Sequence, residues 1–143
     1  MSWSGGCQCG AVRFRVEGAL SDPSICHCRM CQKAMGAPFG AFVGAVPDEV
    51  VWTRGAPKHF QSSNKVRRGF CGDCGTPLTF EIGKALGLAI FTFDRAAEIA
   101  PQMQLQPEAG PDWVRHVAEL EVLRAPPGYL EAIVSHQHPD HDT

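Results

Sequence analysis

The sequence predicts a mainly β domain in which clustered cysteines bind metal. Most of the chain between residues 39 and 93 consists of short runs rich in β-branched or aromatic residues, and turn residues separate these runs. The 143 residues also contain seven cysteines in three tight groups: Cys7 and Cys9; Cys26, Cys28 and Cys31; Cys71 and Cys74. Clustered thiols in an odd number favour metal binding or catalysis over a closed disulfide framework, which stays an alternative.

Composition and charge narrow the class of protein further. A chain of 143 residues fits one domain with its own core. The net charge of -2 gives no sign of the basic surface that nucleic-acid binding needs, so we expect no nucleic-acid partner. The sequence contains no run of about 18 apolar residues, so we expect no membrane span. Residues 1–6 lack the features of a signal peptide. We therefore expect a cytoplasmic protein without a membrane partner, in a compartment where thiols stay reduced.

The first third of the chain predicts one strand, one turn and one short helical turn. Alternating apolar and charged residues predict a half-buried strand over residues 11–16. The residues Ser21-Asp22-Pro23-Ser24 are typical of a turn. Residues 29–34, which include Cys31, predict a short helical turn that we expect Gly36 and Pro38 to end.

The middle of the chain predicts a series of strands. From the β-branched and aromatic runs we expect them at residues 39–43, 50–53, 58–61, 66–70, 76–82 and 88–93. A connection over residues 83–87 would join the last two. Asp94 is placed to cap a short helix over residues 94–100, which Pro101 would stop.

The last third carries weaker signals. Residues 102–110 are polar and contain proline, which predicts a long loop. Residues 113–123 suit a helix or a strand equally well. We place one zinc-binding β domain over residues 1–125 and expect residues 126–143 to form a mobile tail, because termini are poorly ordered unless something ties them down.

The two outer cysteine pairs predict a structural metal site. Zinc takes four ligands in a tetrahedron, and a structural site fills all four positions. The C-x-x-C turn from Cys71 to Cys74 offers two thiolates, and Cys7 with Cys9 is the natural second pair, since a glycine follows each pair. Zinc held in this way would tie the N-terminal strand to the middle of the chain, and its binding free energy would become folding free energy.

The three central cysteines predict a different kind of site. Three protein ligands and one open position are typical of catalytic zinc, which makes Cys26, Cys28 and Cys31 the candidate catalytic residues. Three thiolates on Zn²⁺ leave a net charge of -1, so the ion would lower the pKa of bound water less effectively than one held by three histidines. An incoming thiol is a better fourth ligand, which favours sulfur chemistry over hydrolysis.

Two other interpretations of the central group stay open. A second structural zinc would need a fourth ligand such as His27 or His59, and the protein would then be a non-catalytic, zinc-stabilised binding module. His27 lies between two of the cysteines in sequence, so we expect it in solvent instead. A thiol redox protein would form a reversible disulfide between Cys28 and Cys31 without metal.

Together the cysteine motifs resemble those of a known family. The three stretches that carry the similarity are Gly6-Cys7-Gln8-Cys9-Gly10-Ala11-Val12-Arg13-Phe14, Cys26-His27-Cys28-Arg29-Met30-Cys31 and Arg68-Gly69-Phe70-Cys71-Gly72-Asp73-Cys74-Gly75-Thr76-Pro77-Leu78. They are similar to motifs of the glutathione-dependent formaldehyde-activating family, which includes the centromere protein V type. The resemblance implies the β-tent fold, in which small antiparallel sheets lean together around two zinc ions with few short helices. It implies structural zinc at Cys7, Cys9, Cys71 and Cys74, and catalytic zinc at Cys26, Cys28 and Cys31.

The resemblance also implies an activity. The family's reaction is carbon–sulfur lyase chemistry, the condensation of glutathione with formaldehyde into S-hydroxymethylglutathione or the reverse. We therefore expect a zinc-dependent lyase that acts on a thiol adduct, with a small-molecule thiol such as glutathione as its partner. The sequence departs from the family at Gln102-Met103-Gln104-Leu105, where members commonly carry a histidine, and in its tail.

Two further sets of residues have weaker claims to function. We expect Arg13, Arg15, Arg67 and Arg68 on the solvent-facing sides of strands, where a carboxylate-rich ligand such as glutathione could use one of them. The tail segment from His136 through His138 to His141 resembles the H-x-H-x-D-H metal motif of the metallo-β-lactamase superfamily. Only Asp142 and Thr143 come after it, too few residues to complete such a site, so we expect a mobile tail there, with a weak metal site as the alternative.

Overall fold

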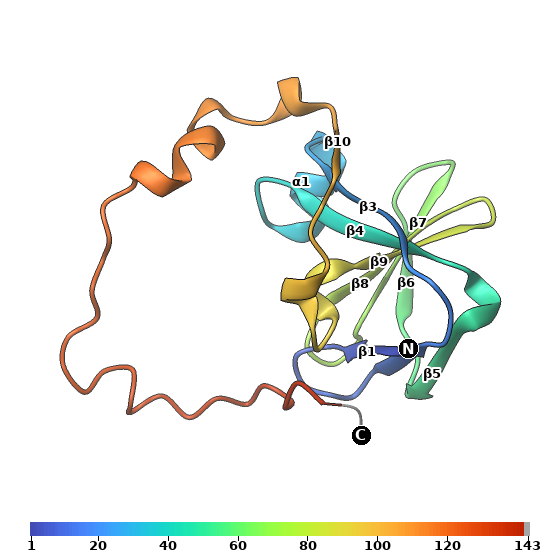
Figure 1. Cartoon of the computed structure of the whole chain (residues 1–143), viewed down its shortest axis with the longest axis horizontal. Helices are drawn as coiled ribbons and strands as arrows, with labels where there is room; N and C mark the ends of the chain where they lie inside the picture. The colour runs from blue at the N-terminus through green and yellow to red at the C-terminus, as the bar shows by residue number, and fades with distance from the viewer. Residues whose placement is uncertain (142–143) are drawn as a thin grey trace.

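The structure is a computed structural model that describes residues 1–141. Its ten strands form two sheets, and the single α-helix of the described residues has seven residues, which confirms the mainly β class. Figure 1 shows the N-terminal strands at the base of the molecule, the larger sheet above them, and the chain after β10 as a long arc that returns to the base.

The smaller sheet joins the N-terminal strands to one later strand. Its order is β1 (Trp3–Gly6), β2 (Arg13–Val16) and β5 (Val50–Arg54), with both pairs antiparallel. Phe14 is fully buried, and its ring packs edge-on against Trp52 and Phe93 at centroid distances of 5.9 and 5.0 Å. The apolar residues of β2 therefore place an aromatic cluster at the centre of the core, although Arg13 of the predicted charged side is buried too.

The larger sheet has seven strands. In spatial order they are β10 (Met103–Leu105), β3 (Ser21–Cys26), β4 (Gly40–Ala45), β9 (Ala85–Ala89), β8 (Pro77–Ile82), β7 (Val66–Phe70) and β6 (Lys58–Gln61). All neighbours are antiparallel except β10 and β3, which run parallel. The strands predicted at residues 58–61 and 66–70 have the bounds expected, and those at 39–43, 50–53 and 76–82 differ by one or two residues.

The α-helix carries one of the central cysteines into the core. Helix α1 (Arg29–Met35) begins after Cys28, whose sulfur accepts the backbone N–H of Cys31, and it ends at Gly36. Gly36 has the left-handed conformation (φ 61°) that favours glycine, as predicted. Cys31 is thereby buried against Phe42 and Ala89 of the larger sheet. The other helices are 3-10 helices, at Pro47–Glu49, Ile90–Thr92, Ala96–Glu98, Pro107–Ala109 and Asp112–Glu119.

Two predicted connections are strands instead. The turn expected at residues 21–24 belongs to β3, where a register shift against β4 and the positive φ of Asp22 (48°) accommodate the turn-forming residues. The loop expected at residues 102–110 contains β10, because Met103–Leu105 pairs with residues 24–26 of β3. The local sequence does not show a partner almost eighty positions away.

Two other elements are displaced from their predicted positions. The strand expected at residues 88–93 is β9 at Ala85–Ala89, because the chain already turns at Gly83, and residues 90–92 form a 3-10 helix. The helix expected at residues 94–100 is a single 3-10 turn at Ala96–Glu98. Asp94 does not cap it, because its carboxylate accepts two hydrogen bonds from Arg13.

The end of the chain runs outside the two sheets. The exposed segment of residues 121–137 returns to the N-terminal turn (Figure 1). There the His138 N–H donates to the Gln8 carbonyl at 2.7 Å. Arg13 donates to the His141 carbonyl, also at 2.7 Å. Residues 142 and 143 of the predicted tail lie outside the described residues, and the domain boundary at residue 125 stays a prediction. Among residues 1–141, no helix has the length and apolar character that a membrane span requires.

Candidate functional site

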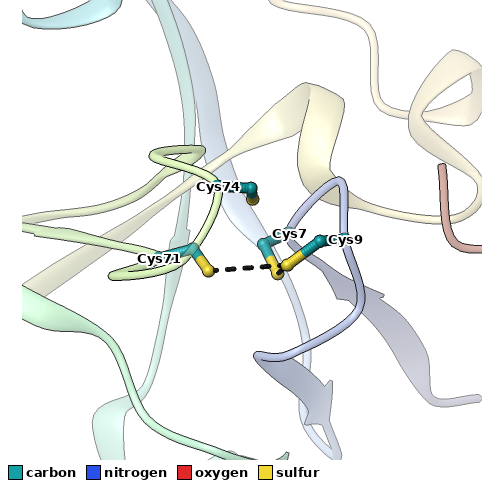
Figure 2. Close-up of side chains that lie close together, drawn as sticks. All are labelled: Cys7, Cys9, Cys71 and Cys74. Atoms are coloured by element: carbon teal, nitrogen blue, oxygen red, sulfur yellow. Dashed lines mark hydrogen bonds between the residues drawn. The ribbon is translucent and has the colours of Figure 1, made fainter. Parts of the chain in front are cut away.

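Four cysteines from two distant turns meet at one point. Cys7 and Cys9 lie in the turn between β1 and β2, and Cys71 and Cys74 lie in the turn between β7 and β8 (Figure 2). All four sulfur atoms lie within 4.8 Å of one another. The predicted pairing across the chain is thus found in the geometry, and we call this set the four-cysteine group.

The sulfur spacing fits a tetrahedral metal ion. The Cys7 and Cys9 sulfurs are 3.6 Å apart, and the Cys9 and Cys71 sulfurs are 3.9 Å apart. A tetrahedron with metal–sulfur bonds of about 2.3 Å has edges of about 3.8 Å. The four-cysteine group could therefore hold a zinc-sized ion with little rearrangement.

Backbone geometry in the two turns supports the four sulfurs. The Val12 N–H donates to the Cys7 sulfur at 3.2 Å, and the Asp73 N–H donates to the Cys71 sulfur at 3.4 Å. Such bonds stabilise a thiolate. The glycines after the two pairs, Gly10 and Gly75, have φ values of 79° and 80°, which other residues adopt only with strain.

The other three cysteines also meet. Cys26 ends β3, Cys28 caps α1 and Cys31 lies in its first turn, and the three sulfurs are within 4.8 Å of one another. We call this set the three-cysteine group. None of the seven cysteines forms a disulfide.

The three-cysteine group has no fourth protein ligand among residues 1–141, since no histidine, aspartate or glutamate there has a ligand atom close enough to join it. His59 bonds to Glu81 at 3.0 Å instead. His27 is also turned elsewhere, with its Nε2 3.0 Å from Oε1 of Gln104. The three sulfurs therefore leave a tetrahedral position open.

The prediction that His27 lies in solvent is wrong. Its side chain is only 7% exposed, and its ring packs edge-on to Phe39 at 5.5 Å. The backbone N–H of His27 also donates to the Leu105 carbonyl at 3.0 Å. Gln104 and Leu105 belong to the segment where this sequence departs from the family resemblance, and here they anchor the cysteine loop to β10.

Arg68 supports the three-cysteine group, which the sequence did not indicate. We expected it on a solvent-facing strand, but it is only 7% exposed. Its Nη2 donates to the Cys31 sulfur at 3.4 Å, its Nε donates to the Ser62 hydroxyl at 3.0 Å, and its guanidinium stacks over the Phe80 ring. A buried guanidinium beside thiolates offsets their negative charge. The local sequence of β7 does not show that Arg68 is buried, because its partner Cys31 comes from a distant part of the chain.

Arg13 is the second arginine that the solvent prediction misplaced. It is 2% exposed, and its two Nη atoms donate to the two oxygens of Asp94 at 2.8 and 2.7 Å. The Ser4 hydroxyl donates to the same carboxylate. These bonds outweigh the effect of burial and lower the pKa of Asp94. Arg15 and Arg67 are more exposed, as expected, and pair with Glu17 and Glu81.

Each group contains a thiol whose pKa is lowered. In the three-cysteine group, burial opposes ionisation of Cys28, but hydrogen bonds from the backbone and the neighbouring cysteines outweigh it and lower its pKa. Burial raises the pKa of Cys31 to about 12, although Arg68 acts in the opposite direction. In the four-cysteine group, burial also opposes ionisation of Cys74, yet hydrogen bonds from Thr76 lower its pKa to about 6. Each group thus contains one thiol that ionises more readily than an ordinary cysteine and could bind a metal ion first.

The tail histidines join neither cysteine group among the described residues. The His138 and His141 rings lie 5.8 Å apart beside the N-terminal turn. The weak metal site considered for this segment stays a prediction.

The fold and the two groups define a mainly β protein with two cysteine-based candidate metal centres. The chain belongs to the glutathione-dependent formaldehyde-activating enzyme family, whose sequence profile matches residues 2–109. Over 78 residues it is 32% identical to a Schizosaccharomyces pombe protein described as an uncharacterized lyase; the match covers 54% of this chain and 56% of that protein. A Rhodobacter sphaeroides protein of known crystal structure shares the fold at 20% identity and a TM-score of 0.58, over 71% of this chain and 99% of its own.

Proposed function

We propose that the protein is a zinc-dependent carbon–sulfur lyase whose reaction takes place at the three-cysteine group. The observation that carries this proposal is the convergence of Cys26, Cys28 and Cys31 without a fourth protein ligand among residues 1–141. Family membership and the relative described as a lyase add support. The four-cysteine group, which is already complete, would hold a structural zinc ion.

The residues around the three-cysteine group suit an incoming thiol. Zinc bound there would supply a Lewis acid that lowers the pKa of that thiol. Three thiolates and Zn²⁺ sum to a charge of -1, and the guanidinium of Arg68 brings the buried total to zero. The Cys28 sulfur is held at the start of α1 by the N–H of Cys31. The loop between Cys26 and Cys28 is held by the hydrogen bond between His27 and Gln104.

The proposed reaction joins a thiol to an aldehyde or separates them. The thiolate sulfur attacks the carbonyl carbon and forms the C–S bond. The π electron pair of the C=O bond moves to the oxygen, which takes up the proton that the thiol lost. The reverse reaction breaks the same C–S bond, and neither direction needs an oxidant or a reductant. Glutathione and formaldehyde are the pair that the family description indicates.

The experiment compares the native protein with Cys28→Ser and Met30→Ala. Zinc per chain is measured together with the exchange rate between formaldehyde, glutathione and their adduct by NMR. We expect two zinc ions in the native protein and one in Cys28→Ser, with exchange at the uncatalysed rate. Met30 lies between two ligands but its side chain is 48% exposed, so Met30→Ala is the matched control and should keep both ions and the activity.

Two results would contradict the proposal. A Cys28→Ser protein that still accelerates exchange would mean that the three-cysteine group is not the reaction site. A native protein whose second zinc ion has a fourth protein ligand, as measured by X-ray absorption, would be a binding module with two structural ions.

A further inference from the structure

A cavity of about 280 Å³ opens beside the three-cysteine group. Cys26 and Cys31 form one part of its wall. The larger cavity of about 620 Å³ lies against His59 and Arg67 and is lined by no cysteine. The smaller one is therefore the cavity that a group attached to the reacting sulfur or carbon would enter.

The wall of this cavity is mostly apolar. Phe42 and Phe80 contribute aromatic rings, and Leu86 and Leu105 contribute aliphatic side chains. Asp22 is the charged residue of the wall, and no lysine, arginine or histidine of residues 1–141 lines it. A carboxylate of glutathione would meet a like charge at Asp22, and the Arg68 guanidinium, which donates to Cys31, is not part of the wall. An apolar group would be favoured, at about fourfold tighter binding for each buried methylene.

The volume sets the size of the group. A cavity of about 150 Å³ lined by leucine, isoleucine and phenylalanine is large enough to bind benzene. The space beside Cys26 and Cys31 is larger than this, at about 280 Å³. The adduct carbon that formaldehyde supplies bears no carbon substituent, so it would leave this space unfilled.

We infer that the cavity binds an apolar substituent of the thiol adduct, of about the size of a phenyl ring or a short alkyl chain. The inference rests on the proposed function and names its substrate class. The bond that forms or breaks is still the one between the thiol sulfur and the carbonyl carbon, and the substituent only fills the cavity. Either partner could carry it, the aldehyde as in phenylacetaldehyde or the thiol as in benzyl mercaptan.

The first measurement separates these two sources. One series combines glutathione with formaldehyde, butanal, hexanal and phenylacetaldehyde, and the other combines formaldehyde with glutathione, butanethiol and benzyl mercaptan. We expect kcat/KM to rise about fourfold per methylene in one series until the cavity is full. The series that shows the rise identifies the partner carrying the substituent. If kcat/KM is highest for glutathione with formaldehyde, the inference is overturned, but the proposed function is not.

Variants that fill the cavity test its role directly. A Cβ added at Gly87 would lie 3.5 Å from the Phe80 carbonyl oxygen and 3.6 Å from the Phe42 Cβ, which are ordinary contacts, so Gly87→Ala should fold. Ser24→Leu, also in this wall and not in that of the larger cavity, fills the space from a second position. We expect both to lower the preference for the apolar substrate over the small one by about tenfold. Ala118→Leu adds the same side chain at an exposed position outside the wall and should not change that preference.

A binding measurement gives a result even without turnover. The methyl NMR signals of Val43 and Leu105, which line this cavity and not the larger one, are followed while benzyl alcohol, which carries no thiol or aldehyde, is added. We expect these signals to shift and those of Leu130, in the exposed tail, to stay in place. If no thiol and aldehyde pair is turned over, the proposed function fails, and the methyl signals alone decide whether the cavity takes an apolar group. Unshifted signals overturn the inference.

Discussion

The two cysteine groups differ in how much of the chain each one connects. The four-cysteine group joins the turn after β1 to the turn after β7, through residues as far apart as Cys7 and Cys74. The three-cysteine group lies within one stretch from Cys26 to Cys31. A metal ion in the first group would tie together two turns that are far apart in the sequence, so its binding would contribute to folding. A metal ion in the second group would connect residues that are already neighbours in sequence, so we expect it to add less to the fold.

The two groups also differ in how their nearby arginines are neutralised. Arg13, which lines the same small cavity as Cys7, is paired with the carboxylate of Asp94. Arg68 has no acidic partner among the ion pairs of residues 1–141, and its Nη1 is buried without a hydrogen-bond partner there. Its Nη2 donates to the Cys31 sulfur instead, and thiolates bound to a metal ion there would balance its charge. Arg13 therefore joins β2 to Asp94, whereas Arg68 contacts the three-cysteine group.

The sharpest test of this comparison places Cys71→Ser beside Cys28→Ser. Cys71→Ser removes one of four ligands from a buried position, and we expect it to lose the structural metal and at least about 5 kcal/mol of unfolding free energy. Cys28→Ser should lose the other metal with only a small change in stability, because serine also caps a helix well. Zinc content and thermal unfolding are measured on both. Equal destabilisation by the two variants would contradict the division into a structural and a catalytic group.

A second test breaks the buried ion pair on the side of the four-cysteine group. Asp94→Asn removes the carboxylate that pairs with the buried Arg13, and we expect a loss of about 3–5 kcal/mol in urea unfolding. The exposed pair of Arg15 and Glu17 gives the matched control, since Glu17→Gln should cost less than about 1 kcal/mol. The three-cysteine group should keep its metal in both variants.

The pH dependence of stability depends on the same carboxylate. Because folding lowers the pKa of Asp94 below its ordinary value of 3.8, the stability it contributes is complete above that value. It is lost as the pH falls through the lower, folded value. Unfolding of the native protein between about pH 5 and pH 2 should show this loss. Asp94→Asn should remove this part of the acid dependence, and an unchanged acid profile would mean that another carboxylate is responsible.

A third test addresses Arg68 on the other side of the comparison. Arg68→Gln removes the charge next to Cys31, and we expect the affinity of the three-cysteine group for zinc to fall about 10- to 100-fold. Arg68→Lys keeps the charge and should restore part of that affinity. Arg67→Gln alters the neighbouring, half-exposed arginine and serves as the control. Competition with a chelator measures each affinity, and equal values for Arg68→Gln and Arg67→Gln would contradict the role of Arg68.

The sequence revealed the features that depend on neighbouring residues. Local patterns predicted the helix that ends at Gly36 and most strands of residues 39–82, and the structure confirms these elements. The C-x-x-C spacing likewise pointed to Cys71 and Cys74 as a pair of neighbouring thiols. The burial of Arg13 and Arg68 could not be predicted, because their partners Asp94 and Cys31 are 81 and 37 positions away. Strand β10 and the buried position of His27 could not be predicted for the same reason, because β10 pairs with the distant β3 and its Gln104 bonds to His27. The candidate ligands were thus predictable, but the residues that support them were not.

The smallest effect is expected from the tail, which the structure places on the side of the four-cysteine group. Its contacts there include the hydrogen bonds from His138 to Gln8 and from Arg13 to His141. Ending the chain after residue 125 removes them, and we expect a loss of about 1 kcal/mol in unfolding free energy, since each hydrogen bond contributes little net stability. Zinc should leave the four-cysteine group somewhat faster under a chelator, while exchange of the thiol adduct keeps its rate. If the truncated protein loses the metal of the three-cysteine group, the tail also supports the reaction site. The two cysteine groups would then depend on each other, although different arginines lie beside them.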